Sequence, residues 1–600
     1  MERLLWFVRN APAIDVILPV LKPLLVGMAL YQLDYLWLAI RCIWTRVLGR
    51  PGFQGFANGS APSACVVLPT LLRSAADYRG LLDAASSVIT NGYPGRLTVV
   101  LAIDDRTERP DLFADLCAWC ARVACPDGVR IAAVGGRRRE GKAMAIERGL
   151  DLLREWERRD ASSALPTVFF NMDADSELGP RALERMAFKL TQPAWFGDRP
   201  MIVASNVSVR ATHYWGGWRR FFSVEGQVAI SVAREYMTSI SLGKHNTRVL
   251  PVTSVSGALY ATWFELHEMA PRFARFLTTI RVRDLASWWL GGAPPSFAGR
   301  TWEPLPEAMI GPGDDTYVTW VASMATWRDG RLSLDFPRTP AGALLALARY
   351  WVCRPIAYDP LAKVYTSSPT SVRGLFRQRV RWNGSRLFNT RRLGPAMAFH
   401  WGIALAVLAD LAIVAMLNVA LLGAVVLAPF VPGTRNWLAL SLMVSAATLT
   451  FRALGTALAI FIDGDHQQWR KLLAVPVSLP YHFVFNILTT LVAWVEDLLL
   501  FGAKTNFAPE QTLIDSQTTR PALLYRARRA FLLAIRSVTV GDVPFGWWWF
   551  GWRESPFTPN GYEGWISGRV PPQVFSPEPA LGELTRETAR RTRTVRARVG

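Results

Sequence analysis

The chain has few cysteines and few histidines for its length, six of each among 600 residues. So low a cysteine content does not build a disulfide framework. Cys117, Cys120 and Cys125 do cluster, but no second CxxC pair and no nearby histidine completes a zinc site. We therefore interpret Cys117 and Cys120 as residues on one face of a helix that packs against a sheet in a reducing compartment.

Acidic residues are also scarce relative to basic ones, with 47 Asp and Glu against 67 Lys and Arg and a net charge of +20. The arginines are spread along the chain and no nucleic-acid-binding module is recognisable, so we predict no nucleic-acid partner. The excess positive charge then has two candidate roles, and both stay open. Cytoplasmic loops of membrane proteins are rich in Lys and Arg, and a positive field would also attract an anionic small substrate.

Long apolar stretches are abundant. The tracts 399–431, 437–462 and 472–502 each exceed the roughly 20 residues that a helix needs to cross a bilayer. A further apolar run over 17–44 is long, carries bulky Trp and Tyr, and lacks a small-x-small cleavage site, so we interpret it as a retained anchor rather than a signal peptide. The sequence predicts a multi-pass protein of the cell (inner) membrane.

Between these runs, strand and helix patterns alternate. Alternation of this kind predicts an α/β fold with a parallel core sheet flanked by helices, in which ligands bind beyond the carboxyl ends of the strands. The expected strands cover 65–70, 97–105, 129–134, 166–176, 201–210 and 253–261, and the expected helices cover 77–89, 112–124, 141–156, 220–237 and 314–327.

Four regions follow from this pattern. We expect an N-terminal membrane anchor of one or two helices over 1–50 and a cytoplasmic α/β domain over 51–395. Transmembrane helices follow over 396–503, and the tail over 504–600 is rich in Trp and ends in basic residues. The catalytic chemistry is therefore expected in the second region.

Two acidic motifs stand where an α/β fold places its ligands. Asp173 and Asp175 end an apolar strand, and the pair Asp314 and Asp315 begins a predicted helix. One or two carboxylates together with phosphate oxygens hold a hard divalent ion, and a carboxylate can deprotonate a hydroxyl. A surface turn rich in Asp is the ordinary alternative, but the apolar strand before Asp173 favours a metal site.

The segment 378–382 reads Gln-Arg-Val-Arg-Trp. A guanidinium binds phosphate in a bidentate manner, and an indole stacks on a sugar ring. As alternatives, Arg379 and Arg381 are positive charges next to a membrane, and Trp382 is an interfacial anchor. Following the two acidic motifs, the segment predicts transfer of a sugar from a nucleotide.

The motifs then match a known family in their order. They are AIDD, GKAMAIERGL, DAD, SVSGALY, GDD, IAYDP and QRVRW, between Cys65 and Trp382. In these motifs the chain resembles the processive family-2 membrane glycosyltransferases, the group of cellulose, hyaluronan and chitin-oligosaccharide synthases. The resemblance implies a GT-A type sheet domain inserted between N-terminal and C-terminal transmembrane helices.

The resemblance also implies roles at the donor side of the site. Asp104 or Asp105 would contact the uridine end of the donor, and Lys142 its diphosphate. Asp173 would position the nucleotide, and Asp175 would ligate Mg²⁺ or Mn²⁺. Lys142 has an ordinary alternative as a helix-start lysine, although the helix dipole disfavours a cation there.

At the acceptor side, the resemblance makes Asp315 the general base, with Asp314 beside it. It places Ser256 and Gly257 near the acceptor terminus. The residues implied to bind the diphosphate and to stack near the acceptor sugar are Gln378, Arg379, Arg381 and Trp382.

The expected function is an inverting, metal-dependent polysaccharide synthase. It would polymerise a UDP-sugar into a β-linked chain and pass the growing polysaccharide across the bilayer, with accessory export subunits as candidate partners. Three alternatives stay open: a non-processive enzyme that acts on a lipid-linked acceptor, a GDP-sugar polymerase of the alginate type, and a transport or scaffold subunit with an inactive transferase domain.

The chain departs from the family pattern in three places. Its acidic pair is GDD, as in hyaluronan-type synthases, rather than TED. The gating-loop motif is not recognisable. The tail contains no RxxxR followed by a D/N-x-S-x-x-G motif, so the sequence does not support regulation by cyclic di-GMP.

Overall fold

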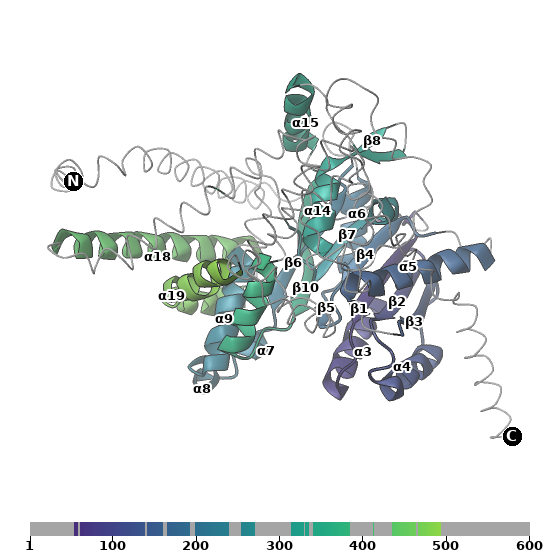
Figure 1. Cartoon of the computed structure of the whole chain (residues 1–600), viewed down its shortest axis with the longest axis horizontal. Coiled ribbons are helices and arrows are strands. Elements are labelled where there is room, and N and C mark those ends of the chain that lie inside the picture. Colours follow the sequence, from purple (N-terminus) through teal and green to yellow (C-terminus); the bar gives the residue numbers. More distant parts are fainter. Residues whose placement is uncertain are drawn as a thin grey trace, which may run out of the picture.

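The computed structural model describes the following residues: 53, 55–57, 60–137, 141–159, 165–192, 199–238, 254–269, 314–328, 331–334, 340–353, 355–384, 412, 435–463 and 466–493 (Figure 1). The expected anchor over 1–50 and the tail over 504–600 lie outside the described residues. So does the apolar tract 399–431, apart from residue 412.

An eight-stranded sheet forms the core, in the order β3-β2-β1-β4-β7-β6-β10-β5. Neighbours from β3 to β4 are parallel, as are β6 and β10, whereas β7 and β5 run antiparallel to their neighbours. The predicted α/β fold with a largely parallel sheet is confirmed. The strands are β1 (Ala64–Thr70), β2 (Leu97–Ile103), β3 (Val129–Gly135), β4 (Val168–Met172), β5 (Ser176–Leu178), β6 (Ile202–Val209), β7 (Leu259–Trp263) and β10 (Ile356–Thr366).

The strands of the core are nearly continuous apolar runs because helices cover the sheet. Every residue of β4 and β7 is buried, as expected for strands covered on both faces. In the view of Figure 1, α3 (Ala75–Ile89) and α4 (Pro110–Arg122) lie below β1 to β3, and α5 (Lys142–Arg159) lies above them. Cys117 and Cys120 are free, partly buried residues of α4.

The antiparallel strands bring extra loops to one edge of the sheet. In the register of β4 with β7, Met172 pairs with Leu259, so β7 begins beside the end of β4. In the same way Thr366, the last residue of β10, pairs with Ser176, the first residue of β5. We call this side the carboxyl edge. Residues that precede β7 or β5 therefore lie on the same side of the sheet as residues that follow β2, β4 or β10.

Two predicted helices differ in extent from the observed ones. The segment 220–237 divides into α8 (Trp218–Phe221) and α9 (Val224–Glu235), because Ser223 Oγ accepts a hydrogen bond from the Gly226 N–H and caps a new helix. The helix predicted over 314–327 is too long. Helix α14 (Asp314–Met324) ends early, and Trp327 lies in a hairpin.

That hairpin consists of β8 (Ala325–Arg328) and β9 (Arg331–Leu334). Its formation moves the indole of Trp327 off the helical path and onto Trp263, edge to face, with 5.1 Å between ring centroids. Aromatic packing against the core strand β7 thus outweighs the helical spacing that the sequence displayed. Helix α15 (Pro340–Cys353) follows the hairpin and precedes β10.

The C-terminal described part is helical and apolar. Helix α18 (Arg435–Asp463) falls on the tract 437–462. The tract 472–502 is broken after η4 (His466–Ala474), where Pro476 lacks the N–H that a continuous helix needs, and resumes as α19 (Ser478–His482) and η5 (Phe483–Leu488).

Among the described residues, no single helix is both long enough and apolar enough to cross a membrane. One pair of helical segments, Gln468–Ala474 with Ser478–Ala493, is together long and apolar enough for a membrane span, and the two halves are bent by 80°. The apolar segment Thr448–Phe461 of α18 is shorter than a span.

Candidate active site

Four distant parts of the chain meet beside Gly257 at the carboxyl edge. A Cβ atom on Gly257 would lie 3.4 Å from Asp173 Oδ2, 3.4 Å from Lys142 Nζ and 3.6 Å from Asp315 Oδ2. Asp173 follows β4, Gly257 precedes β7, Lys142 begins α5 and Asp315 stands in the first turn of α14. The structure therefore gathers four residues that the sequence singled out separately.

Lys142 and Asp173 form an ion pair across this site. Lys142 Nζ lies 2.8 Å from Asp173 Oδ1, and both side chains are about one-third exposed, 33% and 37%. The main-chain N–H of Asp173 donates to the carbonyl oxygen of Ala258, 3.3 Å away. A backbone hydrogen bond thus joins the end of β4 to the loop that contains Gly257, and the charged side chains of Lys142 and Asp173 lie beside the same loop.

Asp104 holds the start of α5. Its buried carboxylate accepts a hydrogen bond from the Gly141 N–H at 2.7 Å, and its carbonyl oxygen accepts one from Arg148 Nη1 at 2.9 Å. A carboxylate is favoured at this helix end by the exposed amides and the dipole. Asp104 therefore fixes the position of Lys142 in the first residue of the helix.

Asp105, the next residue, turns its carboxylate back to the chain. Its Oδ1 accepts hydrogen bonds from the N–H and from the hydroxyl of Thr107, at 2.8 and 2.7 Å. This is an Asx turn of the kind that shapes loops after strands. The predicted contacts of Asp104 and Asp105 with a nucleotide stay predictions.

Asp175, two residues beyond Asp173, is an exposed residue. Its Oδ2 accepts a hydrogen bond from Ser367 Oγ at 2.5 Å, across the pairing of β5 with β10. Desolvation, and then the charge of Asp173, raise the pKa of the Asp175 carboxyl above its ordinary value. Two neighbouring carboxylates, one of them with a raised pKa, form a place where a divalent cation would relieve an unfavourable charge.

The donor set suits an ion that keeps some ligands from water or substrate. Within the described part of the chain, no group of three or more His, Cys, Asp or Glu residues is arranged to hold a metal. Mg²⁺ is commonly bound by one or two carboxylates plus substrate phosphates and water. Asp173 and Asp175 fit that pattern, and Mn²⁺ shares this preference for oxygen ligands.

Asp315 is tied to the Gly257 loop through α14. Its Oδ1 accepts from the Thr316 N–H at 2.8 Å, and its carbonyl oxygen accepts from Thr319 Oγ1 at 2.6 Å. Thr319 Oγ1 in turn accepts from the Val255 N–H at 3.0 Å.

Ser256, in the same loop as Gly257, accepts from the Ala258 N–H through its hydroxyl at 3.3 Å. The side chain of Asp314 lies outside the described residues.

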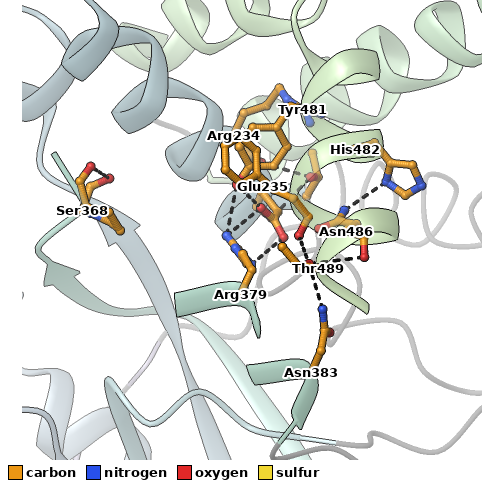
Figure 2. Close-up of polar contacts among 12 residues, drawn as sticks. Arg234, Glu235, Ser368, Arg379, Asn383, Tyr481, His482, Asn486 and Thr489 are labelled. Atoms are coloured by element: carbon orange, nitrogen blue, oxygen red, sulfur yellow. Dashed lines mark hydrogen bonds and ion pairs between the residues drawn. The ribbon is translucent and has the colours of Figure 1, made fainter. Parts of the chain in front are cut away.

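The predicted segment 378–382 lies on a helix over 372–384. Arg381 is exposed and Trp382 is partly buried, whereas Arg379 is buried and makes two hydrogen bonds with Glu235, at 2.8 and 2.7 Å (Figure 2). Gln378 Oε1 is buried and has no hydrogen-bond partner among the described residues.

Tyr236 connects this helix with the acidic site. Its ring lies 6.2 Å from that of Trp382, nearly parallel at 23°. Burial raises the pKa of the Tyr236 hydroxyl, Arg379 opposes this, and the charges of Glu235, Asp175 and Asp173 add to the increase. The charges of Asp173 and Asp175 therefore act on Tyr236.

Four residues of the site were not found by sequence reasoning: Ser367, Glu235, Tyr236 and Tyr481. Ser367 directly follows β10, a strand that the sequence analysis did not assign. Glu235 and Tyr236 stood in a predicted helix without any motif. Tyr481 offered one signal, a hydroxyl inside an apolar tract, where polar groups need a partner.

Comparisons with known proteins give limited likeness. No family model matches the chain, and no curated protein matches it. Among solved structures, the mannosyltransferase PcManGT from Pyrobaculum calidifontis, in complex with GDP-Man and Mn²⁺, is 17% identical and covers 76% of this chain and 98% of its own, with a TM-score of 0.37.

A second solved structure, GalNAc-T7 with UDP, GalNAc and Mn²⁺, is 14% identical and covers 25% of this chain and 23% of its own, with a TM-score of 0.15. At these TM-scores neither likeness carries an argument about the chemistry of the site.

Proposed function

We propose that the chain is a metal-dependent glycosyltransferase that moves a sugar from a nucleotide-sugar donor to an acceptor hydroxyl with inversion. One observation carries the proposal: Lys142 Nζ, Asp173 Oδ2 and Asp315 Oδ2 surround the same point above Gly257, within 3.4 to 3.6 Å of it. A cation, a metal-binding carboxylate and a separate carboxylate are the three charged groups that such a transfer needs.

At the donor end, Asp175 and Asp173 would hold Mg²⁺ or Mn²⁺, which supplies charge neutralisation for the departing diphosphate. Lys142 would add a second positive charge there, since its ammonium already faces Asp173 at 2.8 Å. Gln378, whose buried carbonyl oxygen has no hydrogen-bond partner among the described residues, is suited to accept a hydrogen bond from a bound hydroxyl. Arg381 is exposed and suited to a phosphate.

At the acceptor end, Asp315 would act as general base. The Thr316 N–H holds its Oδ1, and its Oδ2 is the oxygen directed at Gly257. A base fixed in this way can take the proton of an acceptor hydroxyl as the hydroxyl attacks the sugar carbon. Attack from the side opposite the leaving diphosphate inverts the configuration, which gives a β-linkage from an α-linked donor.

We further infer that the acceptor is a growing polysaccharide, that the donor is a UDP-sugar, and that the product crosses the bilayer through helices of the same chain. The QRVRW segment and the apolar tracts support this inference. A GDP-sugar polymerase of the alginate type and a non-processive enzyme with a lipid-linked acceptor are the alternatives. The metal, the nucleotide sugar and the bilayer are then its partners, together with any export subunit.

A multi-pass inner-membrane location with a cytoplasmic catalytic domain belongs to the same proposal. An exposed aromatic and basic surface on α8 and the residue after it supports it. Trp218 is 57% exposed and Phe222 72% exposed, and Arg219 and Arg220 between them are exposed too. Indoles and cationic side chains are the groups that favour a lipid interface.

Nucleotide release by the purified, detergent-solubilised full chain tests the proposal. The protein is offered a panel of UDP- and GDP-sugars with Mg²⁺ or Mn²⁺, beside an Asp315→Asn variant, and products are sized. Release from one donor, lost in the variant and accompanied by a high-mass product, supports the synthase. A short or lipid-linked product favours the non-processive alternative, and absence of release from every donor refutes the glycosyltransferase.

A further inference from the structure

A buried charge pair lies behind the predicted acceptor side of the site. Glu235, at the end of α9, accepts two hydrogen bonds from the guanidinium of Arg379, one to each carboxylate oxygen (Figure 2). It accepts a third from the hydroxyl of Tyr481, at 2.7 Å. We call Glu235, Arg379 and Tyr481 the Glu235 network. It joins three elements, α9, the helix over 372–384 and α19.

The network is closed to solvent. The side chain of Arg379 is 7% exposed and that of Glu235 14%. Burial by itself would lower the pKa of Arg379, but the charge of Glu235 raises it and the net shift is upward. Both terminal nitrogens of Arg379 are occupied by Glu235, and one of them also donates to Tyr481 at 3.1 Å. Arg379 therefore faces its network, whereas the exposed Arg381 is the arginine of this segment that a phosphate can reach.

Trp382 packs against Arg379, which Glu235 holds, and against Tyr236, the residue that follows α9. The guanidinium carbon of Arg379 lies 4.4 Å from the centroid of the Trp382 ring. Tyr236, the neighbour of Glu235, presents its ring nearly parallel to that indole. A cation over an aromatic face and a stacked ring both restrict how an indole can tilt. Glu235 sets the first contact through Arg379, and Tyr236 makes the second directly.

The helix over 372–384 is also fastened from its far side. Asn383 Nδ2 donates to Thr489 Oγ1 at 3.0 Å, and Arg379 Nη2 donates to the hydroxyl of Tyr481 at 3.1 Å (Figure 2). These two contacts attach the segment that carries Trp382 to the bent apolar pair Gln468–Ala474 and Ser478–Ala493. Glu235 takes part in the second of these attachments, because its carboxylate binds both Arg379 and Tyr481.

From this arrangement we propose that Glu235 is a positioning residue for the acceptor sugar. It touches no substrate. Its carboxylate fixes Arg379, Arg379 fixes the plane of Trp382, and Trp382 presents that plane to the acceptor. The inference rests on the proposed function, because it assigns Trp382 to the acceptor side of a glycosyltransferase site.

The test separates acceptor use from donor chemistry. Full-length Glu235→Gln is compared with wild type in transfer to a short oligosaccharide of the sugar that the enzyme accepts, and in nucleotide release with no acceptor added. A misplaced acceptor lowers kcat/KM for the oligosaccharide by about 10- to 100-fold, while release without acceptor stays within about twofold. Glu225→Gln, the same change at an exposed position on α9, is the matched control and leaves both rates unchanged.

A double variant shows whether Glu235 acts only through stability. Glu235→Gln leaves a buried cation unpaired, so it lowers the unfolding temperature, and Glu235→Gln with Arg379→Gln removes that cation and recovers part of the loss. Transfer to the oligosaccharide is expected to stay low in the double variant, because the Arg379 cation that lies over Trp382 has then been removed. Recovery of transfer together with stability would overturn the inference.

The two proposals fail in distinguishable ways. If wild type releases nucleotide and Glu235→Gln transfers to the oligosaccharide as well as wild type does, Glu235 has no positioning role and the glycosyltransferase stands. If Glu235→Gln lowers acceptor-free release as much as transfer, the inference is likewise wrong. If wild type releases no nucleotide from any donor, both proposals are refuted.

Discussion

Replacing Gly257 by alanine tests the convergence of charged groups at the carboxyl edge. The new methyl group would lie 3.4 Å from Asp173 Oδ2, 3.4 Å from Lys142 Nζ and 3.6 Å from Asp315 Oδ2. All three are ordinary van der Waals distances, so no atom must move to admit it. Gly257 is not among the residues with positive φ, and its backbone therefore suits alanine.

The stability of the Gly257→Ala variant should be close to that of wild type. Alanine restricts the unfolded chain more than glycine does, which favours the folded state by about 0.4–1 kcal/mol where the backbone is compatible. Placing an apolar methyl group among three charged groups opposes this gain. The free energy of unfolding is thus expected to change by no more than about 1 kcal/mol.

Activity should fall far more. The methyl carbon stands about 1.5 Å beyond Cα, so any substrate atom that approaches the glycine must retreat by a similar distance. A misplacement of about 1 Å costs on the order of 100-fold in rate, which corresponds to about 2.7 kcal/mol of transition-state stabilisation. We expect a loss of this size in nucleotide release with an unchanged unfolding temperature.

Initial rates of nucleotide release and thermal unfolding, measured on one preparation, decide the matter. Gly455→Ala is the control, because a methyl group on that glycine of α18 meets no atom of the described residues within 4 Å. If Gly257→Ala releases nucleotide at the wild-type rate, the proposed site is wrong, since the methyl group would displace a substrate bound among Lys142, Asp173 and Asp315. Equal loss of rate and of stability would point to a damaged fold instead.

Two further predictions concern the charges. Desolvation and the charge of Asp173 raise the pKa of the Asp175 carboxyl, so the contribution of this group to stability is present at low pH and is lost as the pH rises through the folded-state pKa. In the presence of a chelator, the Asp175→Asn variant should therefore unfold at a higher temperature than wild type near pH 7, and this difference should vanish at about pH 4. Mn²⁺ should raise the unfolding temperature of wild type only. Lys142→Gln should lower kcat/KM for the nucleotide sugar by about 10- to 100-fold, and an unchanged kcat/KM would refute a role of Lys142 at the diphosphate.

Much of the α/β domain could be read from local patterns. Apolar runs such as Val168–Met172 identify buried strands in any α/β fold, and a carboxylate at the end of such a run, as Asp173 is, falls on the ligand-binding edge by topology alone. Local pattern does not fix the direction of a strand, however. The antiparallel entry of β7, which brings Gly257 to Asp173, depends on how the strands pair across the whole sheet.

Long-range side-chain contacts escaped the sequence altogether. Glu235 binds Arg379 and Tyr481, which lie 144 and 246 residues away in the sequence. The residues around each of these positions give no sign of the partner. Trp327 illustrates the opposite error. Its spacing fits a helix, but its ring packs on Trp263, a contact that only the folded sheet creates.

The gathering of the site on one edge leaves the other edge of the sheet available for engineering. The loops over 90–96 and 123–128 precede the parallel strands β2 and β3, and so lie opposite the carboxyl edge. Pro126, Asp127 and Gly128 are exposed there, as suits a tolerated insertion point. An affinity tag or a fluorescent domain inserted at Asp127 would let the protein be immobilised through the side of the sheet opposite the carboxyl edge, with the site facing the solution.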